Sequence, residues 1–201
     1  AERVALCTNV FPSLLKRYIF HTVPVYDYVL MTEPLTDEQL ASIGWEGREG
    51  LADMANQFHY SRLTADNRIL WGGRASFGPT EPEKAAPALR RMMLAVFPEL
   101  KEVQITHAWT GNVAFTFDFL PHIGLQDGIH YAAGCQGSGV AMATWLGHRA
   151  ALKIAGADNE GFALDGLNFP TVPLYNGNPN WFLPMVGGWY RLRDHMDRAA
   201  A

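Results

Sequence analysis

The sequence contains little cysteine: two of its 201 residues, Cys7 and Cys135, which lie far apart. Their separation matches neither a CxxC redox pair nor a zinc-ligand spacing, so we expect reduced thiols. Pairs of histidines four residues apart, the spacing of a helical metal site, are also missing. The histidines considered for this are His21, His59, His107, His122 and His130. We therefore predict no metal site.

Long apolar runs and an excess of basic charge are absent as well. No run approaches the roughly 20 apolar residues that span a bilayer, and the N-terminus lacks the regions of a signal peptide. The formal net charge is −4 and the pI is near 6.0, so no broad basic field favours nucleic acid or an anionic membrane. We expect a soluble, cytoplasmic protein whose main partner is a small molecule, with no nucleic-acid or membrane partner.

A glycine-rich nucleotide-binding motif is also missing. Neither GxGxxG nor GxxxxGK followed by Ser or Thr occurs, so no segment predicts the usual binding of a dinucleotide pyrophosphate or a nucleotide phosphate. The composition is that of a folded domain, with 48% hydrophobic and 18% charged residues. We expect a sizeable apolar core rather than disorder.

Alternation of apolar and polar residues predicts several strands. Residues 22–33 alternate in this way and end at Pro34, and the apolar run of residues 4–7 is also typical of a strand. A hairpin is predicted in residues 58–73, with a turn at residues 65–67. Further strands are predicted at residues 102–112 and 129–134, with a short segment, DFLPHIG, between them.

Helical spacing of apolar residues predicts the helices. Asp37 is expected to cap a short helix that ends near Ile43. Residues 82–96 predict a second helix, which Pro98 ends. Its expected apolar positions are Ala88, Leu89, Met92, Met93 and Val96. A long apolar helix is predicted at residues 138–156, and a final turn or helix within residues 181–196. Strands and helices mixed in this way predict an α+β fold.

The glycines after residue 133 can be interpreted in two ways. Gly134, Gly137 and Gly139 let the backbone approach a flat or anionic ligand, and the following helix start offers unpaired N–H groups and a partial positive charge. The alternative is a plain tight turn with Ser138 as the N-cap of the helix. Local spacing leaves both interpretations open.

Several segments, in the correct order, resemble the D-amino-acid-oxidase-type flavin oxidoreductases. They are VALCTN, VPVYDYVLMTEPL, HYSRLTADNRILWGGR, WTGNVAFTFDFLPHIG and HYAAGCQGSGVAMATWLGHRAALKIAG. Within that family the chain is most similar to the gamma-glutamylputrescine oxidase and glycine/sarcosine-oxidase-like members. The resemblance spans nearly the whole chain to residue 156, and its last two segments are the specific ones.

The resemblance implies a two-domain flavoenzyme of which this chain is the C-terminal portion. Residues 1–12 would be the last part of the FAD-binding domain before the substrate domain, and residues 13–116 the substrate domain with a mixed or antiparallel sheet. Residues 117–156 would return to the FAD-binding domain as a strand and helix, and residues 157–201 would form a C-terminal tail or helix. The N-terminal Rossmann half would be missing, so we expect self-association or association with that half.

The resemblance also implies which residues lie near FAD. Cys7, Thr8 and Asn9 resemble the turn that passes close to it, and Gly111, Asp118, Pro121 and Gly124 resemble the W-x-G, T-x-D and P-x-x-G positions. The loop beside the isoalloxazine pyrimidine would consist of Gly134, Cys135, Gln136, Gly137, Ser138, Gly139 and Val140.

The chain departs from the family pattern at four places. Ser138 stands where many relatives have His, and Ala141 or a neighbour stands where sarcosine-oxidase-like relatives have a carboxylate-binding Lys. Val113 is the best match to the Arg of glycine-oxidase-like relatives and cannot pair with a carboxylate. No cysteine lies near Gly111 for covalent attachment. These departures favour an amine or a larger amino substrate and noncovalent FAD.

Three residues are candidates for lining the substrate site and for catalytic roles. Tyr60 and Arg62 share a strand face by the period of two, and the alternative is an exposed hairpin pair. Trp109 could wall the flavin or the amine, with His107 on the same face, and the alternative is a core aromatic on a central strand.

The resulting hypothesis is an FAD-dependent oxidoreductase that oxidises the C–N bond of an amine or amino-acid derivative by hydride transfer to flavin N5. For this chemistry the protein mainly orients a neutral amine and stabilises the anionic reduced ring. The competing hypothesis is a catalytically silent binding or interaction module, which could lack the cofactor because half of its site is absent.

Overall fold

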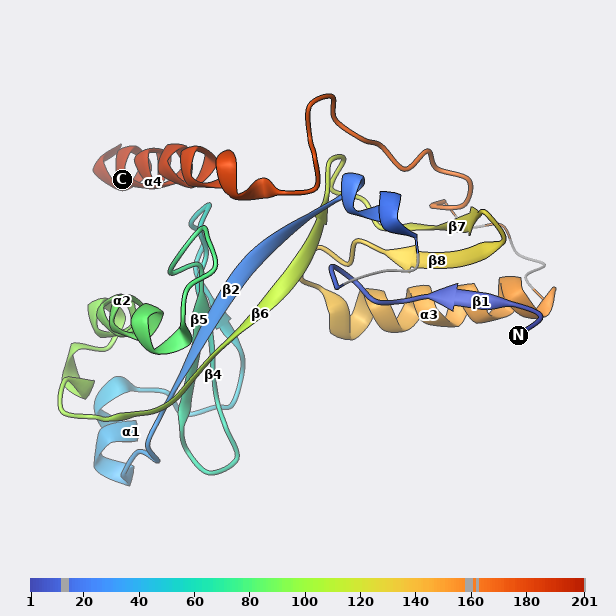
Figure 1. The fold of residues 1–201 in the computed structure, drawn as a ribbon. Helices are drawn as coiled ribbons and strands as arrows, with labels where there is room; N and C mark the ends of the chain where they lie inside the picture. Colours follow the sequence, from blue (N-terminus) through green and yellow to red (C-terminus); the bar gives the residue numbers. More distant parts are fainter. Residues whose placement is uncertain (12–14, 158–160, 162, 201) are drawn as a thin grey trace. The chain divides into compact units, whose positions relative to one another are not determined.

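The computed structural model describes residues 1–11, 15–157, 161 and 163–200, which form two compact units (Figure 1). The first unit contains residues 1–25 and 112–179, and the second contains residues 26–111 and 180–201. Sheets and helices occur in both, so the predicted α+β class is confirmed. The predicted boundary between residues 12 and 13 lies outside the described residues.

The first unit contains a three-stranded sheet with the order β1-β8-β7. Its strands are β1 (Val4–Leu6), β7 (His122–Gln126) and β8 (Ile129–Ala133). β1 is parallel to β8, with Leu6 opposite Tyr131, and β7 is antiparallel to β8. Helix α3 (Gly139–Ala155) packs on this sheet by burying Leu146 and Ala150 against Ile123. The predicted strand, glycine turn and helix are therefore confirmed.

Strand β7 covers residues for which the sequence predicted only a short connecting segment. Gly124 interrupts its apolar pattern, and the reason for that glycine is tertiary. A Cβ at this position would lie 2.6 Å from the hydroxyl oxygen of Tyr131 on β8. The ring of Tyr131 therefore needs a glycine on the neighbouring strand.

The second unit contains a five-stranded sheet with the order β3-β4-β5-β2-β6. Its strands are β2 (Thr22–Thr32), β3 (Leu51–Ala52), β4 (Tyr60–Leu63), β5 (Ile69–Gly73) and β6 (Ile105–Thr116). The first residues of β2 and the last of β6 belong to the first unit. The antiparallel pair β4–β5 confirms the predicted hairpin, and Asn67 supplies the positive φ of its turn.

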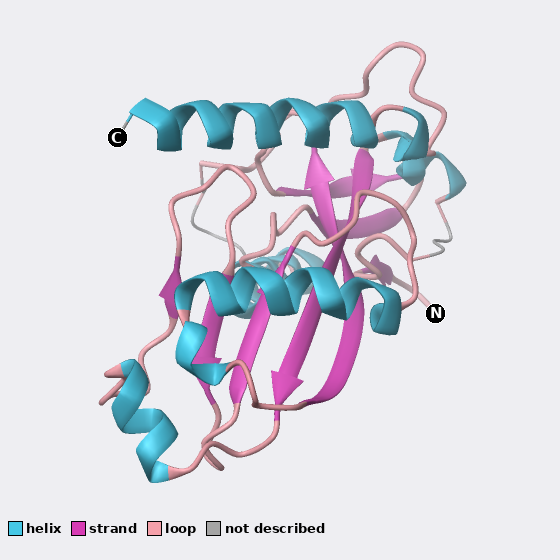
Figure 2. Cartoon of the chain, turned by 90° about the vertical axis from the view of Figure 1, so that its left-hand side faces the viewer, coloured by secondary structure: helices cyan, strands magenta, loops and turns pink. Residues whose placement is uncertain are grey.

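Helix α2 (Pro82–Val96) has the predicted bounds and lies across one face of this sheet (Figure 2). Its buried stripe is Ala85, Leu89 and Met93, which share one helix face at four-residue spacing. They join a core with sheet residues that include Tyr28, Leu30, Ile69 and Trp71. Val96, one of the apolar residues at helical spacing, is 57% exposed at the end of the helix.

Helix α1 (Asp37–Ile43) begins with a capping box at Thr36. The Thr36 hydroxyl accepts a hydrogen bond from the Gln39 amide at 3.2 Å, and Gln39 Oε1 accepts one from the Thr36 amide at 2.9 Å. The prediction of Asp37 as the cap is therefore wrong by one residue. Asp37 lies instead in the first turn, where its charge favours the helix dipole.

Strand β6 begins later and continues further than the predicted 102–112, and the final helix, α4 (Leu183–Ala200), runs through Gly187 and Gly188. A Cβ at Gly187 would overlap the ring of Phe77. Short 3₁₀ helices complete the described elements: η1 (Lys16–Phe20), η2 (Pro98–Leu100) and η3 (Pro179–Trp181). Among the described helices, none is long and apolar enough to cross a membrane.

Candidate functional site

A cleft of about 380 Å³ lies in the first unit, next to the residues that follow strands β1 and β8. Because the two strands are parallel, their carboxyl ends lie at the same edge of the sheet, which is where α/β sheets commonly bind ligands. The cleft is lined by small or short side chains: Cys7, Asn9, Ala132, Ala133, Gly134, Cys135, Gly139, Ala143, Leu146 and Gly147. Both cysteines are free thiols, as predicted.

The loop between β8 and α3 has a backbone that depends on glycine. Gly134 and Gly137 have φ of +73° and +90°, and Gln136 also has a positive φ, of 53°. A Cβ at Gly134 would lie 2.5 Å from Thr116 Cγ2 and 3.2 Å from the Leu120 carbonyl oxygen. This position therefore combines a left-handed backbone with contacts that exclude any side chain.

Gln136 presents a hydrogen-bond acceptor that is buried and unused among the described residues. Its Nε2 donates to the Thr116 hydroxyl at 2.7 Å and to the Gly134 carbonyl at 3.2 Å, which fixes the orientation of the amide. The Oε1 atom is then buried and accepts no hydrogen bond within the described chain. A buried acceptor without a partner costs about 1–3 kcal/mol.

Helix α3 begins at this loop without a side-chain cap. Ser138 occupies the N-cap position, but its hydroxyl makes no capping hydrogen bond. The N–H groups of the first helical turn therefore lack the partner that the plain-turn interpretation requires, and they carry the positive end of the helix dipole. Gly139, the first residue of the helix, lines the cleft.

Hydrogen bonds connect the turn between β6 and β7 with the loop between β8 and α3. Asp118 accepts a hydrogen bond from the Leu120 amide at 3.1 Å, and both of its carboxylate oxygens lie 3.1 Å from His122 Nε2. His122 is 1% exposed and stacks on Phe169 at a centroid distance of 4.2 Å. The Thr116 hydroxyl, which receives the Gln136 amide, donates to the Leu120 carbonyl at 2.8 Å.

Asp118 gives this turn a pH-dependent contribution to stability. Burial alone would raise its pKa, but the hydrogen bonds from His122 and Leu120 outweigh burial and hold the pKa below the ordinary value of 3.8. Because the folded-state pKa is lower than the unfolded one, the ionised carboxylate stabilises the fold above pH 3.8, and this stabilisation is lost as the pH falls through the lowered pKa. We expect Asp118→Asn to lower the free energy of unfolding by about 1 kcal/mol at pH 7 and by less at pH 3.

Urea unfolding of both proteins at the two pH values measures this difference. Asp197→Asn, on the exposed surface of α4, is the matched control and should change stability little at either pH. An Asp118→Asn effect that is equally large at pH 3 would contradict the assignment.

Five of the predicted cofactor-binding residues line the cleft: Cys7, Asn9, Gly134, Cys135 and Gly139. Gln136 and Asp118 hold the loop and the turn, and Val140 is 95% exposed. The roles of these residues, and of Thr8, Gly111, Pro121, Gly137 and Ser138, remain predictions. Sequence reasoning missed Ala143 and Gly147, on the α3 side of the cleft. Both follow the predicted Gly139 at intervals of four residues, and this spacing could have placed them on the same helix face.

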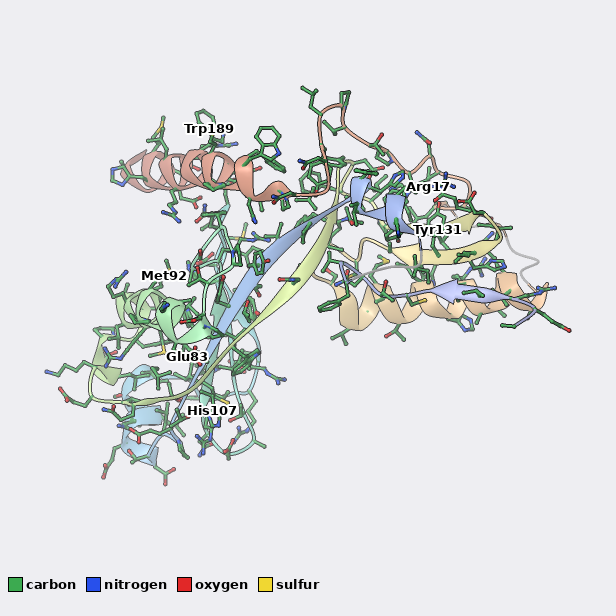
Figure 3. All side chains as sticks on the ribbon, viewed as in Figure 1. Arg17, Glu83, Met92, His107, Tyr131 and Trp189 are labelled. Atoms are coloured by element: carbon green, nitrogen blue, oxygen red, sulfur yellow. The ribbon has the colours of Figure 1, made fainter. Side chains whose placement is uncertain are left out.

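The predicted substrate residues belong to the second unit. Tyr60 and Arg62 share one face of β4, while Ser61 and Leu63 are buried on the other. The Tyr60 hydroxyl donates to Asp27 at 2.6 Å, and Arg62 is exposed. Trp109 is 39% exposed, so the alternative of a core aromatic on a central strand is wrong, because β6 is an edge strand. His107, labelled in Figure 3, is exposed on the same strand.

Comparison with known proteins gives consistent results. The family described as "FAD dependent oxidoreductase" matches residues 1–152. The chain is 33% identical over 199 residues to the gamma-glutamylputrescine oxidoreductase of Escherichia coli, covering 98% of this chain and 45% of that protein. It is also 33% identical over 178 residues to the probable oxidoreductase OrdL of Haemophilus influenzae, covering 86% and 40%.

Solved structures share the fold at low sequence identity. The iminodiacetate oxidase of Chelativorans sp. BNC1 matches with a TM-score of 0.59 at 17% identity, covering 89% of this chain and 46% of that one. The glycine oxidase of Geobacillus kaustophilus matches with a TM-score of 0.55 at 17% identity, covering 78% and 40%. The chain thus spans less than half the length of these relatives.

Proposed function

Because the chain belongs to the family of FAD-dependent oxidoreductases, we propose that the cleft after β1 and β8 holds part of a flavin and that the protein oxidises an amine. The uncapped start of α3, whose first residue Gly139 lines this cleft, is the observation that carries this proposal. Its N–H groups and partial positive charge would favour the carbonyl oxygens and the negative charge of a reduced flavin ring.

The residues present fit such a ring in shape as well as in polarity. The cleft is lined by small side chains, and the positive φ of Gly134 and Gly137 keeps the loop free of Cβ atoms. The loop amide of Gln136 is held by Thr116, so its acceptor has a fixed direction. When bound, FAD would accept a hydride from the carbon of an amine C–N bond.

The chain's own residues would do three things in this reaction. The start of α3 would stabilise negative charge on the cofactor through its N–H groups and dipole. Gln136 would orient the cofactor, and Tyr60, Arg62 and Trp109 would wall the substrate. No cysteine lies near Gly111 in the sequence, where the resemblance would place covalent attachment. We therefore propose noncovalent binding, and release of FAD by acid precipitation tests it.

Two observations support an amine rather than a small amino acid as the substrate. The position that resembles the carboxylate-binding Arg of glycine-oxidase-like relatives is Val113, whose Cγ1 lies 3.8 Å from a Cβ placed on Gly137. An apolar group there offers no partner for a carboxylate. One relative, matched over 98% of the chain, is named for gamma-glutamylputrescine.

We further propose that the first unit belongs to an FAD-binding domain and the second to a substrate domain. β1 lies at the edge of its sheet, and its outer side pairs with no strand of the described chain. An open edge in a parallel arrangement favours continuation by another strand. The dinucleotide-binding half of the domain would supply that strand and the phosphate-binding glycines that this sequence lacks.

FAD titration tests the proposed cleft. We expect the chain to bind FAD, and Gln136→Leu to raise the Kd about tenfold, which corresponds to about 1.4 kcal/mol. Thr144→Val, on the exposed surface of α3, is the control and should leave the Kd unchanged. The measurements are the flavin absorption spectrum and the quenching of flavin fluorescence.

Amine turnover with release of peroxide tests the activity. Oxidation of a primary amine by the FAD-loaded protein would support the proposal and exclude the silent-module alternative. A chain that stays colourless with added FAD, and oxidises no amine, would instead support the catalytically silent module.

A further inference from the structure

Helix α4 is anchored to the second unit along one face. Leu183, Gly187 and Asp194 are buried and, at their spacing of four and seven residues, lie on the same side of the helix. Gln57 Nε2 donates to the Gly187 carbonyl at 2.7 Å, and the Asp194 carboxylate accepts from the Asn56 and Gln57 amides. These contacts fix which side of α4 points away from the unit.

The opposite side of α4 is apolar and exposed. Four apolar side chains recur there at intervals of four, three and four residues, and each is more than half exposed. They are Met185, Trp189, Leu192 and Met196, which we call the α4 stripe (Trp189 is labelled in Figure 3). At a rise of about 1.5 Å per residue, the stripe runs for about 16 Å along the helix. Exposed apolar surface that continues over this length indicates a binding face, unlike the scattered exposure of single residues.

Positive charge borders the α4 stripe. Arg193 lies beside it on one side, and His195 and Arg191 lie on the other, and all three are exposed. The acidic residues of α4 lie elsewhere: Asp194 faces the unit, and Asp197 lies farther from the stripe than Arg193. A binding partner would therefore contact apolar side chains in the middle and guanidinium groups at the edges.

A second copy of this chain is a poor partner for this surface. The α4 stripe offers four side chains, whereas a stable protein interface takes roughly 20–30 residues from each side. In a symmetric pair of α4 helices, each basic border would also face a basic border of the other copy, which is unfavourable. Size and charge thus both argue against self-association through α4.

An anionic lipid surface has the complementary properties. Its headgroup region accepts an amphipathic helix that lies in the membrane plane, with Trp and Leu side chains buried about 5–10 Å deep and basic side chains at the anionic headgroups. Trp favours this depth because its indole is apolar and carries one polar N–H. The expectation of no membrane partner rested on the net charge of −4. That charge does not oppose local contact, since charges more than about 8 Å away are largely screened at physiological salt.

We propose that α4 binds the surface of anionic membranes through the α4 stripe, with Arg191 and Arg193 at the lipid phosphates. The helix lies in the plane of the headgroups and does not cross the bilayer. This inference is independent of the proposed flavin chemistry, which belongs to the cleft of the first unit.

Co-sedimentation of the 201-residue chain with lipid vesicles tests the proposal. Vesicles of phosphatidylcholine and phosphatidylglycerol at a ratio of about 3:1 supply the anionic surface, and vesicles of phosphatidylcholine alone are the neutral control. We expect the partition coefficient on the anionic vesicles to exceed that on the neutral ones at least about tenfold, and to fall as the salt concentration rises.

Matched variants assign the binding to the α4 stripe. Trp189→Gln combined with Leu192→Gln should lower the partition coefficient at least about tenfold, because two of the four inserted side chains become polar. Val96→Gln, at a similarly exposed apolar residue at the end of α2, should leave it unchanged. Arg193→Gln should weaken binding to the anionic vesicles only, whereas Arg91→Gln, exposed on α2, should leave that binding unchanged.

Urea unfolding separates loss of membrane binding from loss of the fold. All of these positions are exposed, so the variants should unfold at the same urea concentration as the unmodified chain. Vesicle binding that is absent from the unmodified chain, or that survives in the variant of Trp189 and Leu192, would overturn the proposal. A dimer in analytical ultracentrifugation that this variant abolishes, with no vesicle binding, would assign the α4 stripe to a second copy instead.

Discussion

Replacing Gly134 with alanine is expected to lower the free energy of unfolding by about 2–4 kcal/mol and to abolish FAD binding. The left-handed φ of +73° disfavours any residue with a Cβ, and the added atom would also lie 2.5 Å from Thr116 Cγ2. Thr116 cannot move freely, because its hydroxyl both receives the Gln136 amide and donates to Leu120. Urea unfolding and FAD titration measure the two effects.

Gly128→Ala is the matched control that measures the cost of the left-handed backbone alone. Gly128 has a similar φ of +77° in the same unit, but an added Cβ meets nothing within 4 Å. We expect this variant to cost only the left-handed conformation, about 1–2 kcal/mol, and to leave the cleft unchanged. If the free energy of unfolding fell equally in the two alanine variants, the close contact with Thr116 would not contribute to the requirement for glycine at position 134.

Replacing Asp194 with alanine is expected to cost about 2–4 kcal/mol and to loosen helix α4. Asp194 is 9% exposed and accepts hydrogen bonds from the Asn56 amide at 2.8 Å, from Asn56 Nδ2 at 2.7 Å and from the Gln57 amide at 3.2 Å. Its loss removes this acceptor from the buried Gln57 amide and from the two donors of the more exposed Asn56. The outer surface of α4 cannot compensate, since side chains such as Trp189, labelled in Figure 3 and 59% exposed, point to solvent.

Hydrogen exchange of residues 183–200 together with urea unfolding measures this effect. Asp197→Ala, three residues further along α4 and exposed, is the control and should stay within about 0.5 kcal/mol of the unmodified chain. Unchanged exchange in α4 of the Asp194→Ala chain would show that other contacts anchor the helix.

Local sequence predicted the elements whose signals are themselves local. The bounds of α2 follow from Pro82, the apolar stripe and the closing Pro98, and the β4–β5 hairpin follows from a turn that tolerates a positive φ at Asn67. The predictions failed where a neighbouring residue is the better cap, or where a residue distant in the sequence determines the local structure. Thr36 rather than Asp37 is the N-cap residue of α1, because the Gln39 side chain completes a capping box with Thr36. β7 was not predicted because Gly124 interrupts its apolar pattern, and this glycine is needed to leave room for the ring of Tyr131 on β8.

In the candidate site, too, the local sequence predicted some features and tertiary contacts determined the others. The glycines after β8 predicted a loop suited to a ligand, and the order of the family segments predicted membership of the FAD-dependent oxidoreductase family, which the comparisons confirm. Neither could predict that Thr116 and Leu120 would surround Gly134. The contact between Asp27 and Tyr60 was also hidden, because it depends on a glycine in a third strand.

The sequence by itself determined the family, the α+β class and the position of the glycine loop, because these depend on the order of motifs and on backbone preferences of single residues. Only the tertiary structure decided that Cys7 and Gly134 border one cleft, because the parallel pairing of β1 and β8 joins distant parts of the chain. It also decided that the Gln136 acceptor is buried and unpaired, since burial and hydrogen bonding depend on which distant residues surround a side chain.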